Sequence, residues 1–479
     1  MHSSVRVLPL AIYATCLASA CGEHGVSGSP ASQPSDFADE LRVRSPVDLD
    51  PDPNVLEIEL EARVADIEFI PGARTEAWTY DGGVPGPLIR AKVGDRVRVH
   101  FKNSLPEPTS IHWHGLRIPT AMDGVPEHGQ APVPPGGSFD YEFTLPDAGT
   151  FWYHPHFASA AQVGNGLYGP LIVDDPKEPR GIGDEVVLML SDIALNPDGT
   201  LIAGDAGGDE ALLAGREGAL LLVNGRVNPT LRAADGLRQR FRLINAAKTR
   251  YFDLALDAHD FLRIGGDGGL IAAPERTSTL LLVPGERADV VVTPTREHAA
   301  DARAPSLRSL EYRRGPAGRA DYSEHELLRL DLRPVAGEPK SALPELARDV
   351  RALDPTAATP IDLFFTMNAG DDGNLAPRIE VVPSTGSHVP ARVGEHQLWS
   401  VTNLTEWDHP FHLHGFFFQL LDVDGVAPAV REWKDTVNVR SASTVRLLVH
   451  FDERPGMWMF HCHILDHADH GMMGMVDLR

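Results

Sequence analysis

Four short histidine motifs restrict what this chain can fold into more than any other feature of its sequence. Ten of its 21 histidines lie in them. The motifs read His112-Trp113-His114-Gly115, His154-Pro155-His156, His409-Pro410-Phe411-His412-Leu413-His414-Gly415 and His461-Cys462-His463-Ile464-Leu465-Asp466-His467. A single His-x-His pair is more often two surface or packed imidazoles than a metal site. Ten histidines and one cysteine exceed any single tetrahedral zinc shell, so the four motifs together indicate more than one metal.

The His-x-His spacing suits β-strands. Residues i and i+2 of a strand point to the same side about 7 Å apart, whereas the residue between them points to the other side. In the fourth motif, Cys462 is therefore expected to face one metal, while His461 and His463 face a different group of metals a few covalent bonds away. This arrangement predicts an electron path through Cys462.

Cys462 is the only cysteine expected in the folded body, because Cys16 lies in an apolar N-terminal segment and Cys21 at its edge. It has no disulfide partner, and a single thiol kept in an exported protein points to a metal or to catalysis. A thiolate, two imidazoles and a weak thioether favour copper in electron transfer. The residues that match this set are Cys462, His409, His467 and Met472, with Met473 as the rival for Met472.

Short alternating runs between turn residues predict an all-β protein. Examples are residues 97–101, 240–244 and 444–449, and 44 Gly and 39 Pro separate such runs. Composition shifts divide the mature chain into three sandwich or barrel domains at 55–175, 184–333 and 361–479. Residues 334–360 are the expected linker, which holds the best helical pattern at about 343–353. The first and third domains share a plan of histidine motifs, which indicates internal duplication.

The first 21 residues are expected to be a signal segment, because Arg6 precedes an apolar run, residues 7–20, that ends in small residues before Cys21. Two processing outcomes fit: cleavage after Ala20 with lipidation of Cys21, or ordinary cleavage nearby. Residues 22–54, rich in Ser, Pro and Asp, are expected to be a disordered tether. The sequence thus predicts an exported protein of the periplasm or outer cell envelope, lipid-anchored if Cys21 is modified.

The charge balance argues against one class of partner. The 43 Lys and Arg stand against 67 Asp and Glu, a formal net charge of −24, and a field of that sign repels phosphate backbones. Nucleic acid is therefore not an expected partner.

The four motifs, in this order and spacing, resemble the copper-ligand signatures of the multicopper oxidases, the laccase-like proteins with three cupredoxin domains. The likeness covers nearly all of the mature chain, because the middle domain also reads like the family. Its matching segments are Val223-Asn224-Gly225, Arg242-Leu243-Ile244-Asn245-Ala246, Gly265-Gly266-Asp267-Gly268 and Pro284-Gly285-Glu286-Arg287-Ala288-Asp289. The resemblance implies three cupredoxin-like Greek-key β-sandwich or barrel domains and, as the family's usual state, a monomer.

Carried over by position, the resemblance also implies four coppers per chain. The type 1 copper would be held by His409, Cys462 and His467, with Met472 axial. The type 2 copper would be held by His112 and His412. The coupled type 3 pair would take His114, His154, His156, His414, His461 and His463. The trinuclear cluster would then lie between the first and third domains, since each supplies half of its histidines.

The activity implied by the resemblance is one-electron oxidation of a reductant at the type 1 copper, coupled through Cys462 to reduction of O2 to water at the trinuclear cluster. Phenols and aromatic amines are the leading reductants, because the chain has only nine Met and no Met-rich insert of the cuprous-oxidase kind. Oxidation of cuprous or other low-valent metal ions is the alternative. An electron carrier or a copper-depleted structural relative is an alternative of another class, against which the intact ligands argue.

Making water needs protons at a buried site, and carboxylates are common relays. The resemblance places Asp123, nine residues after His114, near the cluster as that relay. The other interpretation is an ordinary turn residue in Asp123-Gly124. Many bacterial relatives carry Glu directly after the last type 1 histidine, where this chain has Ala468; Asp469 is the candidate substitute.

Overall fold

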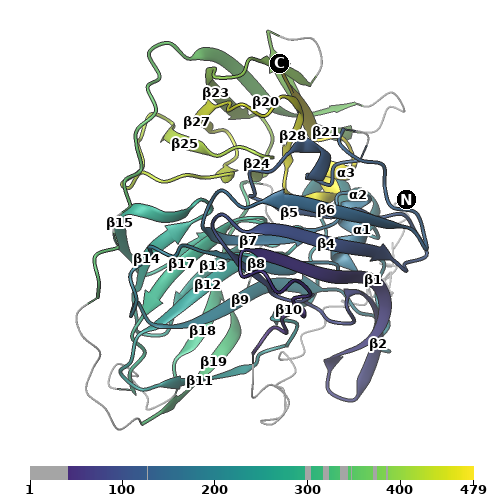
Figure 1. The fold of residues 1–479 in the computed structure, drawn as a ribbon, viewed down its shortest axis with the longest axis vertical. Helices are drawn as coiled ribbons and strands as arrows, with labels where there is room; N and C mark the ends of the chain where they lie inside the picture. Colours follow the sequence, from purple (N-terminus) through teal and green to yellow (C-terminus); the bar gives the residue numbers. More distant parts are fainter. Residues whose placement is uncertain are drawn as a thin grey trace, which may run out of the picture.

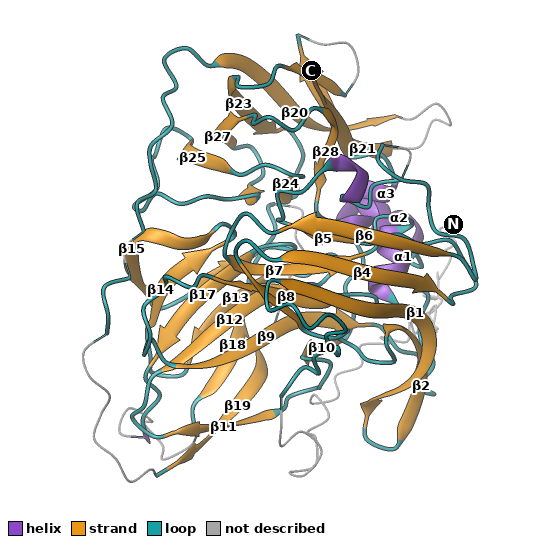
Figure 2. Cartoon of the chain, in the orientation of Figure 1, coloured by secondary structure: helices purple, strands orange, loops and turns teal. Residues whose placement is uncertain are grey.

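The computed structural model describes residues 41–126, 128–296, 304–316, 323–334, 343–346, 348–369, 375–383 and 387–479. Within these residues the chain forms six β-sheets, two in each third of the sequence (Figure 1). Helices are few and short (Figure 2). The predicted all-β class is therefore confirmed. The expected signal segment, residues 1–21 with Cys21, and residues 22–40 lie outside the described residues.

The first third of the chain builds two four-stranded sheets, of order β2-β1-β4-β6 and β3-β8-β7-β5. Its elements are β1 (Val55–Ile70), β2 (Ala73–Tyr80), β3 (Ile89–Lys92), β4 (Arg96–Asn103), β5 (His112–His114), the 3-10 helix η1 (Thr120–Met122), β6 (Ser138–Thr144), β7 (Gly149–His154), α1 (Ser159–Gly164) and β8 (Gly169–Asp174).

The middle third builds a six-stranded sheet, β10-β9-β12-β17-β14-β15, and a five-stranded one, β11-β19-β18-β13-β16. Its elements are β9 (Asp184–Ile193), α2 (Gly208–Ala214), β10 (Leu220–Val223), β11 (Thr230–Ala234), β12 (Gln239–Asn245), β13 (Phe252–Leu256), β14 (Phe261–Gly266), β15 (Gly269–Thr277), β16 (Leu280–Leu282), β17 (Arg287–Val292), β18 (Ser306–Leu310) and β19 (His325–Arg333).

The last third builds two five-stranded sheets, β21-β20-β23-β27-β25 and β22-β29-β28-β24-β26. Its elements are β20 (Thr359–Ala369), β21 (Leu375–Val382), β22 (His388–Ala391), β23 (His396–Asn403), β24 (His409–Leu413), β25 (Phe418–Val423), β26 (Thr436–Val439), β27 (Thr444–His450), β28 (Gly456–Cys462), α3 (Leu465–Asp469) and β29 (Met473–Leu478).

All three thirds follow one plan. In each, the first strand pairs in parallel with a later strand of its sheet: β1 with β4, β9 with β12, and β20 with β23. In each, the second sheet has one parallel pair as well: β3 with β8, β11 with β19, and β22 with β29. Such pairs require connections that cross between sheets, as in Greek-key sandwiches. The three cupredoxin-like sandwiches are therefore confirmed, and the repeat extends to the middle third.

Each sandwich encloses an apolar core of alternating strand residues. On β4, Val97, Val99 and Phe101 are buried while the residues between them are more exposed, which is the period of two expected for a strand with one buried face. A further apolar cluster joins the first two sandwiches and includes Trp152 of β7 and Ile244 of β12. The sandwiches are thus packed against one another through side chains of their strands.

Two connecting segments differ from the sequence-based expectation. Within the predicted tether, residues 41–54 contact the folded body: Leu41 is buried in the core of the middle sandwich, and its carbonyl accepts a hydrogen bond from Asn224. In the linker, the described part of 343–353 forms no helix. Leu346 packs instead into an apolar cluster with Ile264 and Val291. In both segments a leucine is buried against a neighbouring sheet. This burial is the physical reason that the first segment is packed on the folded body and the second is not helical.

The three α-helices of the described residues come from different thirds of the chain and meet in space, with α1 and α2 both in contact with α3 (Figure 2). No helix in the described residues is long and apolar enough to cross a membrane. Since α3 carries His467 and follows directly on β28, this contact fixes the end of the fourth histidine motif against the other two sandwiches.

Candidate metal centres

Two strand pairs, one in the first sandwich and one in the third, present the histidines. β5 pairs antiparallel with β7, which places His112 opposite His154. β24 pairs antiparallel with β28, which places His412 opposite His461. Because alternate strand residues share a side, each pair aims its imidazoles into one space between the two sandwiches. Rings from the two sandwiches stack there: His114 lies 3.8 Å from His412 between ring centroids, and His112 lies 3.9 Å from His414.

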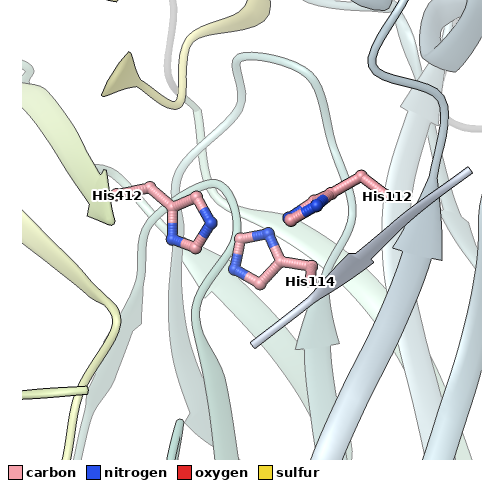
Figure 3. A group of neighbouring side chains, drawn as sticks. All are labelled: His112, His114 and His412. Carbon is pink, nitrogen blue, oxygen red and sulfur yellow. The ribbon is translucent and has the colours of Figure 1, made fainter. Parts of the chain in front are cut away.

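The eight histidines of this space form three groups, in each of which one ligand atom per residue lies within 4.8 Å of the others. The groups are His112, His114 and His412; His114, His154 and His463; and His156, His414 and His461. Figure 3 shows the first group, with His412 approaching His112 and His114 from the opposite side. Every group mixes residues of the first and third sandwiches, so neither sandwich alone could complete one.

The ring nitrogens of these histidines fit metal ions. The Nε2 atoms of His112, His154 and His412 are buried without a hydrogen-bond partner. Their Nδ1 atoms are each held near a backbone carbonyl, those of Pro155 and Asp435 among them. In the third group, His461 Nε2 lies 3.1 Å from His414 Nε2 and 3.4 Å from His156 Nε2. Buried nitrogens converging without partners are what metal ligation would satisfy.

Burial also keeps these imidazoles neutral. Burial first, and then the neighbouring histidines, hold the pKa of His154, His414, His461 and His463 well below the usual value. The same causes lower the pKa of His156 to about 3. Metals bind the neutral imidazole, so the site offers its ligands in the form that a metal requires.

A fourth group combines the cysteine with two histidines. Cys462 Sγ lies 3.5 Å from His409 Nδ1 and 3.7 Å from His467 Nδ1. The hydroxyl of Thr405 lies 2.7 Å from the other nitrogen of His409 and orients that ring. Burial lowers the pKa of His409 to about 3 and raises the pKa of the Cys462 thiol. In this environment a thiolate requires a bound cation, which a metal at this group would supply.

Met472 is placed with this group and Met473 is not. The Met472 side chain is fully buried in the apolar cluster that contains Cys462. Its carbonyl accepts from the Cys462 amide at 3.0 Å, and its amide donates to the His467 carbonyl at 2.9 Å. Met473 belongs to a different cluster on the other face of the sheet. The structure therefore brings together all of the predicted residues of the cysteine group and excludes the rival methionine.

Strand β28 separates the two kinds of group, as the spacing predicted. Trp458, Phe460 and Cys462 point into the core of the third sandwich. His461 points the other way, toward His156 and His414. In addition, His461 Nδ1 lies 2.8 Å from the Cys462 carbonyl oxygen. A covalent connection and a hydrogen bond thus join the cysteine group to the histidine groups.

Asp123 is buried at the edge of the histidine groups. Its Oδ2 lies 2.9 Å from His414 Nδ1, and its carbonyl oxygen lies 2.9 Å from His112 Nδ1. It is also a turn residue, because Gly124 follows with a φ of +80° and a Cβ there would strike the Ile111 carbonyl. Both sequence-based interpretations of Asp123 therefore describe its position: the turn holds its carboxylate against the imidazoles.

Asp435 is a site residue that sequence reasoning missed. Its Oδ1 lies 3.3 Å from His114 Nε2 and 3.5 Å from His412 Nδ1. Arg287 of β17 donates two hydrogen bonds to the same carboxylate. Burial acts to raise the pKa of Asp435, but Arg287 and the two histidines outweigh it and hold the pKa well below its usual range. A permanent negative charge therefore lies beside two of the histidine groups.

The middle sandwich contributes a second missed residue, Gly285. Its φ is +90°, and a Cβ built there would lie 3.0 Å from the His463 ring and 3.1 Å from the His114 ring. Only glycine combines that backbone conformation with so close an approach. Gly285 lies in the segment 284–289, which carries part of the family resemblance. The sequence therefore marked this position, but it did not indicate that the glycine lies against the histidine rings.

Helix α3 holds its acidic residues away from the histidine groups. Asp466 lies in α3, where its carboxylate accepts from Lys248 Nζ at 2.6 Å and from the Arg216 amide at 2.9 Å. The Asp469 carboxylate accepts from the amides of Ser159 and Ala160 at the start of α1. Asp469, the candidate substitute for the missing glutamate, is thus engaged in joining two helices.

The comparisons with known proteins agree over most of the chain. Three family models, each described as multicopper oxidase, match residues 61–178, 177–301 and 353–479. A multicopper oxidase of Mycobacterium tuberculosis is 33% identical over 83% of this chain and 82% of its own. A laccase of Bacillus subtilis is 27% identical over 84% of this chain and 90% of its own.

Solved structures give the same result. A multicopper oxidase from Pseudomonas thermotolerans matches with a TM-score of 0.75 and 33% identity, covering 89% of this chain and 99% of that one. A multicopper oxidase from Campylobacter jejuni, described as a metallo-oxidase, matches with a TM-score of 0.79 and 28% identity, covering 94% of this chain and 98% of that one.

Proposed function

Since the chain belongs to the multicopper oxidase family and is an oxidoreductase that uses O2, we propose that its side-chain groups hold four copper ions of three types. The type 1 copper is assigned to His409, Cys462 and His467, with Met472 axial. The type 2 copper is assigned to His112 and His412. The type 3 pair is assigned to His114, His154 and His463 for one ion and to His156, His414 and His461 for the other.

One observation carries this proposal: the run His461-Cys462-His463 joins the cysteine group to two of the three histidine groups at the end of one strand. Cys462 belongs to the cysteine group, and its two neighbours belong to two different histidine groups. Copper, when bound, supplies one-electron redox chemistry at the cysteine group and the reduction of O2 at the histidine groups. The chain supplies the short covalent path and the hydrogen bond from His461 to the Cys462 carbonyl.

We assign the proton supply to Asp123. Its carboxylate is buried and lies 2.9 Å from His414 Nδ1, while its Oδ1 has no hydrogen-bond partner. A carboxylate so placed can hold and release a proton beside the histidine groups. Asp435 is unsuited to that role, because its two hydrogen bonds with Arg287 keep it ionised.

The leading reductants are phenols and aromatic amines. Trp407 and Tyr312, both partly exposed, lie beside the His409 end of the cysteine group: Tyr312 donates to Asp408, the residue before His409, at 2.7 Å. Arg314 lies between the rings of Trp407 and Tyr251, 5.5 and 5.4 Å from their centroids. An aromatic surface beside the cysteine group suits a planar organic donor.

We further propose that the protein is exported and works in the periplasm or outer envelope as a monomer, with a lipid tether if Cys21 is modified. The apolar run at residues 7–20 supports export. The net charge of −24 supports a small reductant over a polyanionic partner.

The test is copper content, visible spectrum and oxygen uptake of the purified mature protein, with a phenolic reductant and with Cu(I) measured separately. Four coppers per chain, a thiolate-to-copper absorption band and phenol-driven uptake are expected. Uptake with Cu(I) alone would make the protein a metal-ion oxidase. A chain that binds copper only at the cysteine group, or none, would be an electron carrier or a structural relative.

A further inference from the structure

Four of the nine methionines gather on one face of the last sheet. Met457 and Met459 lie on β28, and Met473 and Met475 lie on the neighbouring β29. Together with Val125 of the first sandwich they form a separate cluster. We refer to these four residues as the methionine cluster. It has no part in the groups described above, so its concentration of sulfur needs its own explanation.

The strand register places the methionine cluster on the same face as the histidine groups. Met459 pairs with Met475, and His461 pairs with Met473, across β28 and β29. Met459 and Met457 are two and four positions before His461 and therefore share its side of the strand. Cys462 points to the opposite side, into the core. The cluster thus adjoins the histidine groups and is separated from the cysteine group by the sheet.

On β28 exposure decreases toward the histidines, whereas on β29 Met473, which lies opposite His461, is more exposed than Met475. His388 on the edge strand β22 pairs with Met475 and is exposed. Met457 and Met473 are partly exposed, whereas Met459 and Met475 are each 6% exposed. Beyond them, His461 is fully buried with His156 and His414. The His414 amide donates to the Met459 carbonyl at 2.9 Å, so the methionines abut that group. Met457, Met459 and His461 therefore follow one another along one face of β28, from a partly exposed position to one histidine group.

Packing alone does not require sulfur at four neighbouring positions, because leucine has a similar volume and fills such a face equally well. Thioethers differ from leucine in being soft, neutral ligands that select Cu(I) over harder ions. They bind it without releasing a proton.

We propose that the methionine cluster is a Cu(I)-binding site through which copper reaches the His156, His414 and His461 group when the enzyme is assembled. The proposal rests on the function proposed above, since it concerns the supply of its metal. No electron transfer is involved: the ion moves as Cu(I) from thioethers to imidazoles. The position of the cluster, across the sheet from Cys462, argues that it loads the histidine groups and does not feed electrons to the cysteine group.

The first experiment measures binding on the copper-loaded enzyme, with Ag(I) as a redox-inert probe for Cu(I). Wild type is expected to retain additional Ag(I) after gel filtration, with sulfur neighbours in its X-ray absorption spectrum and without loss of copper. A variant with all four methionines changed to leucine is expected to lose that Ag(I). Met189→Leu, at a buried methionine of the middle sandwich, is the control and should retain it. Equal Ag(I) binding by the leucine variant, or none by wild type, overturns the proposal.

The second experiment measures how fast metal-free protein takes up copper. With Cu(I), the leucine variant is expected to load about tenfold more slowly than wild type. With Cu(II) the two should load at the same rate, and their final copper content should be equal. The double variant Met459→Leu/Met475→Leu repeats the test with fewer changes. A leucine variant that loads Cu(I) as fast as wild type contradicts the proposal.

The two proposals fail differently. A wild-type chain that binds Ag(I) at sulfur but shows no oxygen uptake would disprove the oxidase and leave the methionine site standing. If instead the wild-type chain takes up oxygen but the leucine changes leave Ag(I) binding unaffected, the oxidase would stand and the methionine site would be disproved.

Discussion

Arg287 and Asp435 form a fully buried ion pair in which two guanidinium nitrogens each contact one carboxylate oxygen, at 2.7 and 2.5 Å. The pair joins the middle sandwich to the third, and the carboxylate also faces His114 of the first. A single charge pair therefore connects all three sandwiches where the histidine groups meet. Arg287 also donates to the carbonyls of Thr150, Gly285 and Asp267, which satisfies its three remaining hydrogens.

Asp435→Asn is expected to destabilise the protein by about 3–5 kcal/mol, because it removes the nearer of the two carboxylates that neutralise the buried Arg287 charge and leaves only Asp267, at 3.3 Å. The free energy of unfolding of the metal-free protein measures this. Asp477→Asn, which weakens the exposed pair with Arg479, is the control and should cost less than about 1 kcal/mol. Equal costs for the two variants would show that the buried pair has no special role in joining the sandwiches.

Cys462→Ser is expected to remove the thiolate-to-copper absorption and the oxidation of phenols, while the fold and the copper of the histidine groups remain. Serine has a similar shape, but its hydroxyl is a poor copper ligand and does not ionise here. Visible absorption, copper content and oxygen uptake provide the measurement. Wild-type activity in this variant would rule out the electron path through residue 462.

Sequence reasoning placed the site residues correctly in those segments where a local rule, such as alternation along a strand, determines the direction of the side chains. The period of two along β28 was enough to place Cys462 in the core and His461 among the histidines. It could not reveal Asp435, which lies 148 residues from Arg287 in the sequence and outside any histidine motif. Long-range pairs of this kind arise only when the sandwiches dock, so no spacing within one segment indicates them.

Docking also explains burial that the sequence did not predict. The run 240–244 was predicted only as a strand, and in the structure all of β12 is buried. Arg240 and Arg242 are paired there with Glu178, Glu185 and Asp289. Leu41, Leu346 and Val350 similarly became buried in segments read as tether or linker. A polar composition indicates a solvated segment only when no neighbouring domain covers it.

Asp123→Asn is expected to lower kcat by about 100-fold with little change in copper content, because the amide still accepts a hydrogen bond from His414 but cannot carry a proton. The measurements are kcat and the copper content of the purified variant. Asp469→Asn is the control, since Asp469 caps α1 and lies against Ser159 and Ala160; it should lower stability and leave kcat unchanged. An Asp123→Asn enzyme with the wild-type kcat would exclude a proton-carrying role.

The metal-free protein is expected to lose stability as pH falls below about 6.5, the usual pKa of an unfolded histidine. Burial lowers the pKa of His156 and His409 to about 3 in the folded state. Between these values the unfolded chain takes up protons that the folded chain does not, so each such histidine lowers stability by about 1.4 kcal/mol per pH unit. Above pH 6.5 the effect vanishes.

Denaturant unfolding at several pH values measures the slope of stability against pH. The variant His409→Gln should reduce this slope, whereas His388→Gln, at an exposed position, should not. A slope unchanged by His409→Gln would mean that this histidine is already protonated in the folded protein, which would argue against its role as a metal ligand.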